Sequence, residues 1–430
     1  MRACIVEDRG VALLEPLTLT RAAFDLWCGA SSLLDRQRRT LPVDELGVLV
    51  RPELAGLCRR DHPGLVVNDL GWLNRGPVIL VNARWLPGAT SVADWQTPRV
   101  GLVDDELAYV ILPRPALAAE VLDQLADLPL ADLAESWTET LPSSQAGGAM
   151  IRYPWDLVER NGAELSRDAE LFQGWQRDWS KTASLAVLGP AEQFLAHPET
   201  TIEPFVTVDT RPGPVIIDRG AVIQSFSSLA GPCYIGPDSW IVGAKLRGGT
   251  IGPGCRIGGE VEASIVQGFS NKYHDGFLGH SYVGAWVNLG AGTQTSDLRN
   301  DYGQIRVVIG NERLATGLTK VGVFLGDHTK IGLGTLLNSG TVVGAFCNLL
   351  PSGGLLPLVV PSFCLVKNGQ LSERQDLRQA FATAATVLRR RGQELNDTHI
   401  ELFLTLYDQT AASRQRLIRE SDTRRWRKSV

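Results

Sequence analysis

A strict six-residue period between residues 325 and 355 constrains the fold of this chain more than any other feature. Aliphatic side chains recur at every sixth position, separated mostly by small or polar residues: Leu325, Ile331, Leu337, Val343, Leu349 and Leu355. A helix repeats its apolar face every 3.6 residues and a half-buried strand every second residue, so neither produces this pattern. A hexapeptide repeat is typical of a parallel β-helix, in which about three units close one triangular coil that stacks on the next.

The same period continues upstream, which extends the predicted β-helix to residues 198–370. Its members are Ile235 and Ile241, Ile251 and Ile257, and then Phe277, Val283 and Leu289. The register slips between Ile241 and Ile251 and again after Ser296, and such slips predict loops expelled from a corner. A glycine-rich β-sandwich is the alternative, but its strands would alternate with period two.

Composition limits the classes of partner and compartment. The 430 residues allow two to three domains, and the net charge of −5 gives no bulk attraction to nucleic acid. Seven scattered cysteines form no C-x-x-C pair, and His274 and His280 lack a cysteine pair for zinc. The acidic N-terminus does not resemble a signal peptide, and no apolar stretch is long enough to span a bilayer. We therefore expect a cytoplasmic protein without a metal site.

Residues 1–180 predict an α/β domain. Apolar, valine-rich strands are expected at "ACIV", "LGVLVR", "GLVVN" and "PVILVNARWL", with helices at 116–135 and from "YPWDLVERNG", where Asp156 favours the first turn. Ligands of such open sheets bind beyond the carboxyl ends of the strands, here after Val6 and Val81. Residues 371–430 predict helices, one capped by Ser372 with Gln375 and one over residues 398–419.

The segment from Gly268 to Gly303 is unusually polar for a hexapeptide array. A histidine held on a rigid coil is a good general base, which makes His274 the candidate, and Lys272 beside it can hold a phosphate. The loop after Thr293 leaves the period and can close over a ligand. The alternative is that His274 is simply a polar corner residue.

These residues carry a family resemblance. "YHDGFLGH" followed by "VNLGAGT" resembles the acetyltransferase domain of the GlmU family, which joins uridylyl transfer to glucosamine-1-phosphate acetylation. The resemblance implies a left-handed β-helix, a homotrimer with shared active sites, and acetyl-CoA as acyl donor. It makes His274 the general base and Glu260, fourteen residues earlier, the group that orients it. It also makes Asn288 a substrate-binding residue and places Ala291, with Gly290, at the thioester.

This chain departs from the family pattern at several substrate contacts. Phe277 stands where the family has a tyrosine, and Glu262 stands where it has a lysine. A family arginine falls on Ala244, next to Lys245. The resemblance therefore implies that the phosphate grip is rebuilt from Lys245, Lys272 or Arg247, and Asp275 is a further substrate-binding candidate.

The N-terminal half is similar to a divergent GlmU-like subgroup assigned to sugar nucleotidyl transfer, through "PLTLTR" and "YPWDLVERN". The glycine-rich loop that cradles the nucleoside triphosphate in the well-characterised enzymes is missing. Their metal-binding aspartate is replaced by Asn82 at the end of "PVILV". Arg21 and Asn82 are the nucleotide-binding candidates, and Mg²⁺ would accompany the nucleoside triphosphate.

Three functions remain open from the sequence. The first is acetyl-CoA-dependent N-acetylation of an amino-sugar 1-phosphate, glucosamine 1-phosphate above all, followed by formation of UDP-N-acetylglucosamine. The second is a sugar-1-phosphate nucleotidyltransferase whose β-helix serves assembly or regulation. The third is a non-catalytic scaffold. Trp240, Phe269 and Trp286 are expected on flat β-helix faces, where a homotrimer would cover them.

Overall fold

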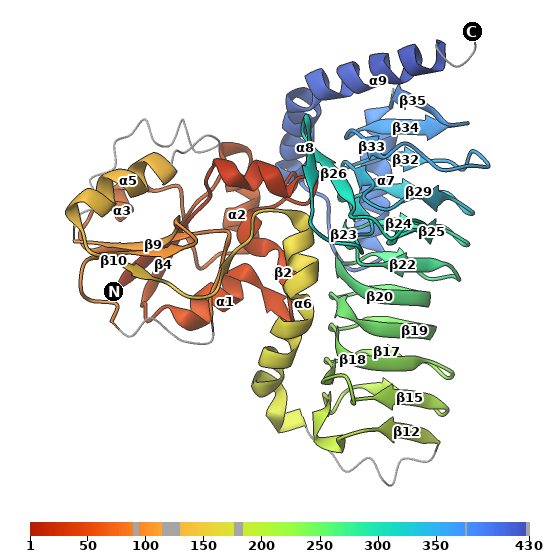
Figure 1. Cartoon of the computed structure of the whole chain (residues 1–430), viewed down its shortest axis with the longest axis horizontal. Helices are drawn as coiled ribbons and strands as arrows, with labels where there is room; N and C mark the ends of the chain where they lie inside the picture. The colour runs from red at the N-terminus through yellow and green to blue at the C-terminus, as the bar shows by residue number, and fades with distance from the viewer. Residues whose placement is uncertain (89–93, 114–129, 176–183, 375, 427–430) are drawn as a thin grey trace.

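Our structure is a computed structural model that describes residues 1–88, 94–113, 130–175, 184–374 and 376–426 (Figure 1). An α/β domain lies beside a long stack of β-coils, and α9 (Ala411–Trp426) lies across one end of that stack (Figure 1). This arrangement confirms the predicted fold class. Within the described chain, no helix is both long and apolar enough to cross a membrane.

The α/β domain is built on one mixed seven-stranded sheet with the order β10-β8-β9-β6-β1-β4-β5. The central strand β1 is parallel to β4 and β6, while β9 is antiparallel to β6 and β8. The strands are β1 Arg2–Val6, β4 Glu45–Leu49, β5 Val66–Val67, β6 Val78–Asn82, β8 Arg99–Val103, β9 Glu106–Leu112 and β10 Ser143–Gln145. β10 lies at the edge of the sheet, parallel to β8.

Five described helices belong to this domain: α1 Leu33–Thr40, α2 Ala55–Asp61, α3 Leu70–Leu73, α5 Leu130–Thr140 and α6 Pro154–Asp168. Asp156 lies in the first turn of α6, as expected, and its carboxylate also accepts the backbone N–H groups of Arg152 (2.8 Å) and Tyr153 (2.9 Å). The helix expected at 116–135 lies largely outside the described residues. Short strand pairs complete the domain: β2 Trp27–Cys28 with β3 Ser31–Ser32, and β7 Trp85–Leu86 with β11 Ala149–Met150.

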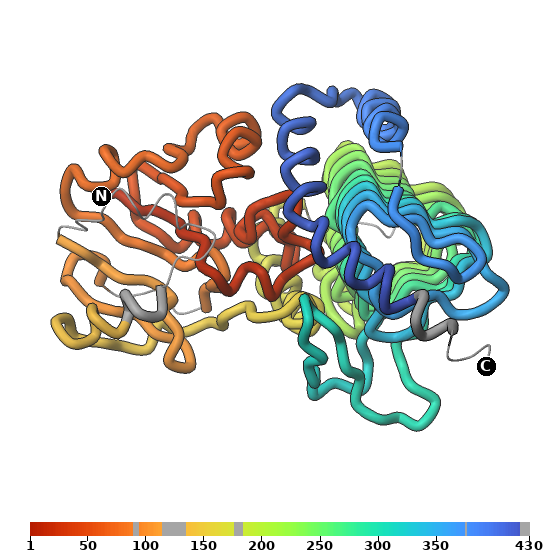
Figure 2. The backbone as a smooth tube through the Cα atoms, turned by 90° about the horizontal axis from the view of Figure 1, so that it is seen from above, coloured from red at the N-terminus to blue at the C-terminus, as the bar shows by residue number. Residues whose placement is uncertain are grey.

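The β-helix has three faces, and the coils superimpose when viewed along their axis (Figure 2). Two long strands, β19 (Trp240–Ile251) and β20 (Arg256–Gly268), and β18 (Ser228–Ile235) run round corners. The inner face, which packs on the α/β domain, adds β13 Phe194–Ala196, β16 Val215–Ile217, β23 Tyr282–Ala285, β28 Phe324–Leu325, β31 Val342–Val343 and β33 Val359–Val360.

The other two faces differ in what covers them. The helix-covered face, which meets α7, consists of β14 Thr201–Ile202, β17 Val222–Ile223, β21 Asn271–Lys272, β24 Asn288–Leu289, β29 Lys330–Ile331, β32 Asn348–Leu349 and β34 Cys364–Lys367. The open face consists of β12 Leu185–Leu188, β15 Val206–Asp209, β22 Phe277–Gly279, β25 Gln294–Thr295 and β30 Leu336–Leu337. The β-helix therefore begins at Leu185, earlier than the predicted residue 198.

The six-residue period sets the interior of the coils. Ile331 pairs with Leu349, eighteen residues and so three six-residue units later. Five of the six period residues are buried: Leu325, Ile331, Leu337, Val343 and Leu349. The sixth, Leu355, is 59% exposed, and its neighbour Leu356 is buried in its place. The repeat thus shifts by one residue in the last coils.

The segment expelled after Ser296 folds on its own. Leu298 and Lys320 close it with an antiparallel bridge, and β26 (Arg306–Ile309) and β27 (Glu312–Ala315) form a hairpin inside it. Ile305 and Val307 bury their side chains in the main apolar core. The hairpin is consequently a packed element here, whereas we expected a loop able to close over a ligand.

Three helices end the described chain: α7 (Leu377–Arg389), α8 (Asp397–Gln409) and α9. Ser372 is not the N-cap of α7, because it lies in β35 (Gln370–Glu373), antiparallel to β34; the cap is Asp376, whose carboxylate accepts the Gln379 N–H at 2.8 Å. The single helix expected over 398–419 is two helices, because α8 ends at Gln409 and α9 begins at Ala411.

A ladder of stacked rings fills the corner between the inner and helix-covered faces. Its members all have left-handed backbone: Phe269, Trp286, His328, Phe346 and Phe363. Phe403 of α8 packs against this ladder. Phe269 and Trp286 therefore lie beneath the chain's own helices rather than on a free face, and Trp240, still 40% exposed, stacks with Arg256 at 4.3 Å. The expectation that a trimer covers these three rings is wrong for Phe269 and Trp286.

Candidate functional site

Four of the residues predicted for acyl transfer meet at one corner. We define the outer corner as the turns at residues 273–276, 290–293 and 332–335, between the helix-covered and open faces. His274 is exposed there, its ring 5.2 Å from that of Tyr273. The Asp275 carbonyl accepts the Gly292 N–H at 2.9 Å, which stacks the Gly290–Ala291 turn on the His274 turn. The corner thus presents an imidazole and an exposed backbone turn on adjacent coils.

Gly276 makes this close stacking possible. Its φ of +136° and the Thr293 carbonyl that would meet a Cβ atom both require glycine. The requirement fixes where the His274 turn lies relative to the next coil.

Lys272 is in the wrong place for its predicted role. It pairs in register with the buried Ile257, so its side chain points into the coil. The ammonium donates to the carbonyls of Gly258 (2.8 Å) and His274 (3.1 Å), and burial lowers its pKa to about 8. Lys272 therefore supports the His274 turn from inside, and the prediction that it holds a phosphate does not fit this structure.

Glu260 lies on the open face and pairs with Arg247. Lys245 is its neighbour in register, and Glu262 extends the charge cluster by accepting from Lys320 at 3.1 Å. Among the described residues, no hydrogen bond joins Glu260 to His274. The orienting role of Glu260 stays a prediction that requires its release from Arg247.

His280 is a candidate that the sequence reasoning missed. Its Nδ1 lies 2.7 Å from the Asp297 carboxylate, and the two side chains are 19% and 11% exposed. Gly279 permits this contact, because a Cβ atom there would meet the Asp297 oxygen. The separation of seventeen residues, about one coil, was the signal available in the sequence. His280 and His274 flank β22, and His280 alone of the two has an orienting carboxylate among the described contacts.

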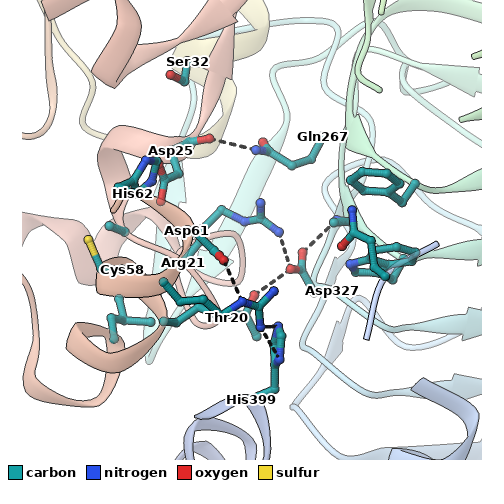
Figure 3. A pocket seen from close by; sticks show the side chains of 18 of the residues that line it. Thr20, Arg21, Asp25, Ser32, Cys58, Asp61, His62, Gln267, Asp327 and His399 are labelled. Carbon is teal, nitrogen blue, oxygen red and sulfur yellow. Dashed lines mark hydrogen bonds and ion pairs between the residues drawn. The ribbon is translucent and has the colours of Figure 1, made fainter. Parts of the chain in front are cut away.

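A large cavity of about 680 Å³ lies between the α/β domain and the β-helix (Figure 3). Arg21 reaches across it to pair with Asp327, which also accepts the Thr20 hydroxyl at 2.8 Å (Figure 3). His62 lines the cavity from the α/β domain and hydrogen-bonds Asp25 at 2.9 Å, a contact that raises the pKa of His62. Arg21, predicted to bind nucleotide, therefore joins the two domains in this structure.

The carboxyl ends of the central strands hold a filled polar cluster. Asn82 is buried and donates to Asp8 at 2.9 Å, and Arg84 donates to both Asp8 oxygens at 2.7 and 2.8 Å. Glu106 accepts from Arg84 at 3.1 Å. These oxygens are already satisfied, so the arrangement does not fit Mg²⁺, and no group of three potential metal ligands occurs in the described part of the chain. Arg21 and Asn82 are not brought together.

The Asn288 side chain does not face the outer corner. It lines a cavity of about 240 Å³ beneath α7. It pairs in register with Asn271 and Lys330 on the helix-covered face. A substrate that touched both His274 and Asn288 would have to extend from the corner under the helix.

Residues 3–176 match the family model described as sugar nucleotidyl transferase. Over 151 residues the chain is 34% identical to a bifunctional sugar-1-phosphate nucleotidylyltransferase/acetyltransferase of Sulfurisphaera tokodaii, covering 32% of this chain and 36% of that protein. Over 295 residues it is 24% identical to the bifunctional protein GlmU of Acidithiobacillus ferrooxidans, covering 61% and 62%. The solved UDP-N-acetylglucosamine acyltransferase from Campylobacter jejuni is 14% identical, with a TM-score of 0.17, covering 48% of this chain and 94% of that one. The chain thus spans about one third to three fifths of these curated relatives.

Proposed function

We propose that this chain is a bifunctional transferase of sugar-nucleotide biosynthesis, because residues 3–176 match the sugar nucleotidyl transferase family model and the chain is similar to GlmU-like proteins. The β-helix transfers an acetyl group from acetyl-CoA to the amine of an amino-sugar 1-phosphate, for which glucosamine 1-phosphate is the best candidate. The α/β domain then joins the acetylated sugar phosphate to a nucleotide, with UDP-N-acetylglucosamine as product.

The outer corner is the observation that supports acetyl transfer. His274 and the Gly290–Ala291 turn occupy adjacent coils, linked by the 2.9 Å hydrogen bond between Gly292 and Asp275. In the reaction the amine nitrogen bonds to the thioester carbonyl carbon and gives up a proton, which His274 accepts. The carbon–sulfur bond then breaks, and the departing thiolate of coenzyme A takes a proton. A positioned histidine is the usual base for such a step.

His280 is a second candidate base, and one observation favours it. Its contact with Asp297 fixes the ring as an orienting carboxylate does in a catalytic triad. His280 also lies near Lys320 on the open face. Its backbone N–H donates to the Glu262 carbonyl, and the Glu262 carboxylate accepts from Lys320. A sugar phosphate held by Lys245 or Lys320 would then lie between the two histidines.

A second function is supported by the extent of the family match. The family model covers the α/β domain and stops before the β-helix. In that reading the chain is a sugar-1-phosphate nucleotidyltransferase, and the β-helix serves assembly. The filled cluster of Asp8, Asn82 and Arg84 argues against efficient nucleotidyl transfer, because those groups would have to exchange their partners before a triphosphate could bind.

One assay with two arms separates these functions. With acetyl-CoA and glucosamine 1-phosphate, we expect the full chain to release free thiol only when the sugar phosphate is present. With UTP, Mg²⁺ and N-acetylglucosamine 1-phosphate, we expect pyrophosphate release that is much slower than thiol release. Rapid pyrophosphate release without any thiol release would replace the proposed function with the second one.

We further expect a homotrimer. Large apolar side chains remain exposed along the β-helix, above all Phe226 (75%) and Leu333 (71%), and Phe205 stacks on Phe226 at 5.7 Å. Leaving such residues together in water is costly, and a β-helix partner can cover them. Sedimentation equilibrium at micromolar concentration should give three times the chain mass of 46.7 kDa. A single species at the mass of one chain would contradict the trimer.

The cysteines agree with a cytoplasmic location for this chemistry. All seven are buried and unpaired. Free thiols persist in reducing compartments, and acetyl-CoA and UTP are supplied there.

A further inference from the structure

Two adjoining cavities lie between α7 and the helix-covered face, and their charged lining is cationic. The first, of about 230 Å³, contains Lys330 and Arg374; the second, of about 240 Å³, contains Lys330, Arg390 and Arg391. Thr383 of α7 lines both. In the part of the chain that the structure describes, no aspartate or glutamate lines either cavity. The positive field inside them is therefore not neutralised locally.

Lys330 forms the wall common to both cavities. Its ammonium donates to the Trp286 carbonyl at 2.5 Å, and no carboxylate of the described chain forms an ion pair with it. Burial, together with repulsion from Arg374, lowers its pKa to about 8, so it is still largely charged at neutral pH. Burying a charge without an opposite charge is unfavourable, which is a reason to expect a ligand that supplies one.

The arginines around Lys330 share this lack of carboxylate partners. Arg374 donates to the Phe346 carbonyl at 3.1 Å, and Arg391 donates to the Gly254 carbonyl and to the Asn271 side chain, at 3.1 and 3.0 Å. Arg374 and Arg391 are half-buried and Arg390 is exposed, whereas the fully buried arginines of the described chain meet acids. Examples are Arg36 with Glu164 and Asp168, Arg51 with Glu7, and Arg84 with Asp8.

Stabilisation of the helix dipole explains only part of the set. Arg390 and Arg391 follow the C-terminal end of α7, where cations are favoured. Arg374 precedes the N-cap Asp376, at the end where a cation is disfavoured, and Lys330 belongs to β29. Two of the four cations thus need another reason for their position.

A buried atom without a hydrogen-bond partner points to the same place. His328 lines the first cavity as well as the interdomain cavity, is only 6% exposed, and its Nδ1 has no hydrogen-bond partner among the described residues. An unsatisfied buried nitrogen is costly, and a ligand oxygen in the cavity would satisfy it.

We propose that the two cavities form a binding site for a phosphate-bearing small molecule, with Lys330 and Arg374 at one end and Arg390 and Arg391 at the other. Asn288 lines the second cavity and leads from it toward the outer corner. This deepens the proposed function and rests on it for the source of the phosphate. The phosphate belongs either to acyl-CoA or to the sugar 1-phosphate, and both share the chemistry that these cations recognise.

Isothermal titration of the full chain at pH 7 tests the site without turnover. The probes are coenzyme A, 3′-dephospho-coenzyme A, glucosamine 1-phosphate and glucosamine. We expect at least one of the two complete probes to bind, and its partner without the phosphate to bind at least tenfold more weakly. Loss with 3′-dephospho-coenzyme A assigns the phosphate to the coenzyme, and loss with glucosamine assigns it to the sugar.

Variants locate the binding in the cavities. Lys330→Met and Arg390→Ala should each weaken the phosphate probe at least tenfold. Arg389→Ala, which removes the same charge from an exposed residue of the same helix end but outside the cavity lining, should stay within twofold. Because Lys330→Met removes a half-buried charge that has no carboxylate partner among the described residues, its melting temperature should equal or exceed that of the native chain. If the melting temperature of Lys330→Met falls instead, the affinity of Arg390→Ala for the phosphate probe tests the site.

Two results would overturn the site. The first is that Lys330→Met and Arg390→Ala leave the affinity for every complete probe unchanged. The second is that no complete probe binds the native chain. Phosphate-dependent binding that the variants abolish, in a chain that releases no thiol from acetyl-CoA, would keep the site and refute the proposed acetyl transfer. Thiol release from acetyl-CoA, together with probe affinities that are unchanged in the variants, would support acetyl transfer and refute the site.

Discussion

Replacing His274 with alanine is expected to lower the turnover number of acetyl transfer by about 10²- to 10⁴-fold, the usual contribution of a positioned general base. The affinity for acetyl-CoA should change little, because the base contacts the amine and its proton rather than the coenzyme. Initial rates of thiol release give the turnover number, and titration calorimetry gives the affinity. Because His274 is exposed in a turn, we expect the alanine variant to stay folded.

His280→Ala is the matched comparison, because the two histidines flank β22. If His274 is the base, His280→Ala should retain most of the turnover number. The reverse result, with His274→Ala unaffected and His280→Ala inactive, would transfer the role to the His280–Asp297 pair. Asp297→Asn should then lower the turnover number as well, because the imidazole loses the carboxylate that orients it.

The six-residue period was sufficient to predict the β-helix. The same period also determines the direction of the Lys272 side chain. Val266, Lys272 and Leu278 are six apart, so the period itself places Lys272 inside the coil with its two buried neighbours. The charge of Lys272 alone is what suggests a phosphate ligand. Residue type suggested one role, whereas register determined the direction of the side chain.

Contacts between distant parts of the chain could not be predicted in this way. Arg21 and Asp327 are separated by 306 residues, and nothing local in either segment signals their ion pair. The placement of α7 over Asn288 and Lys330 is equally nonlocal, so the sequence alone does not show what the Arg389–Arg391 run contacts. Hexapeptide repeats encode neighbouring coils, but they do not encode which helix or domain covers each face.

Substituting Asp327 with alanine should lower the free energy of unfolding by about 3–5 kcal/mol, the range for leaving a buried charge without its partner. Arg21 and Asp327 are 15% and 6% exposed, so water compensates the remaining guanidinium poorly. The variant also removes acceptors from the Thr20 hydroxyl and the Ala285 N–H, each at 2.8 Å. Urea unfolding followed by tryptophan fluorescence measures the change, and an early separate transition would show that the interface opens first.

Two comparisons identify the source of that loss. Asp209→Ala breaks the exposed pair with Arg211 and should leave the unfolding midpoint nearly unchanged. The double variant Arg21→Met with Asp327→Ala removes both buried charges, and it should recover part of the stability lost in Asp327→Ala, because an apolar side chain tolerates the site better than an unpaired guanidinium does. If the double variant is no more stable than Asp327→Ala, the unpaired charge is not the cause. The interface would then depend on the Thr20 and Ala285 hydrogen bonds and on the apolar contacts around Tyr282 and Phe324.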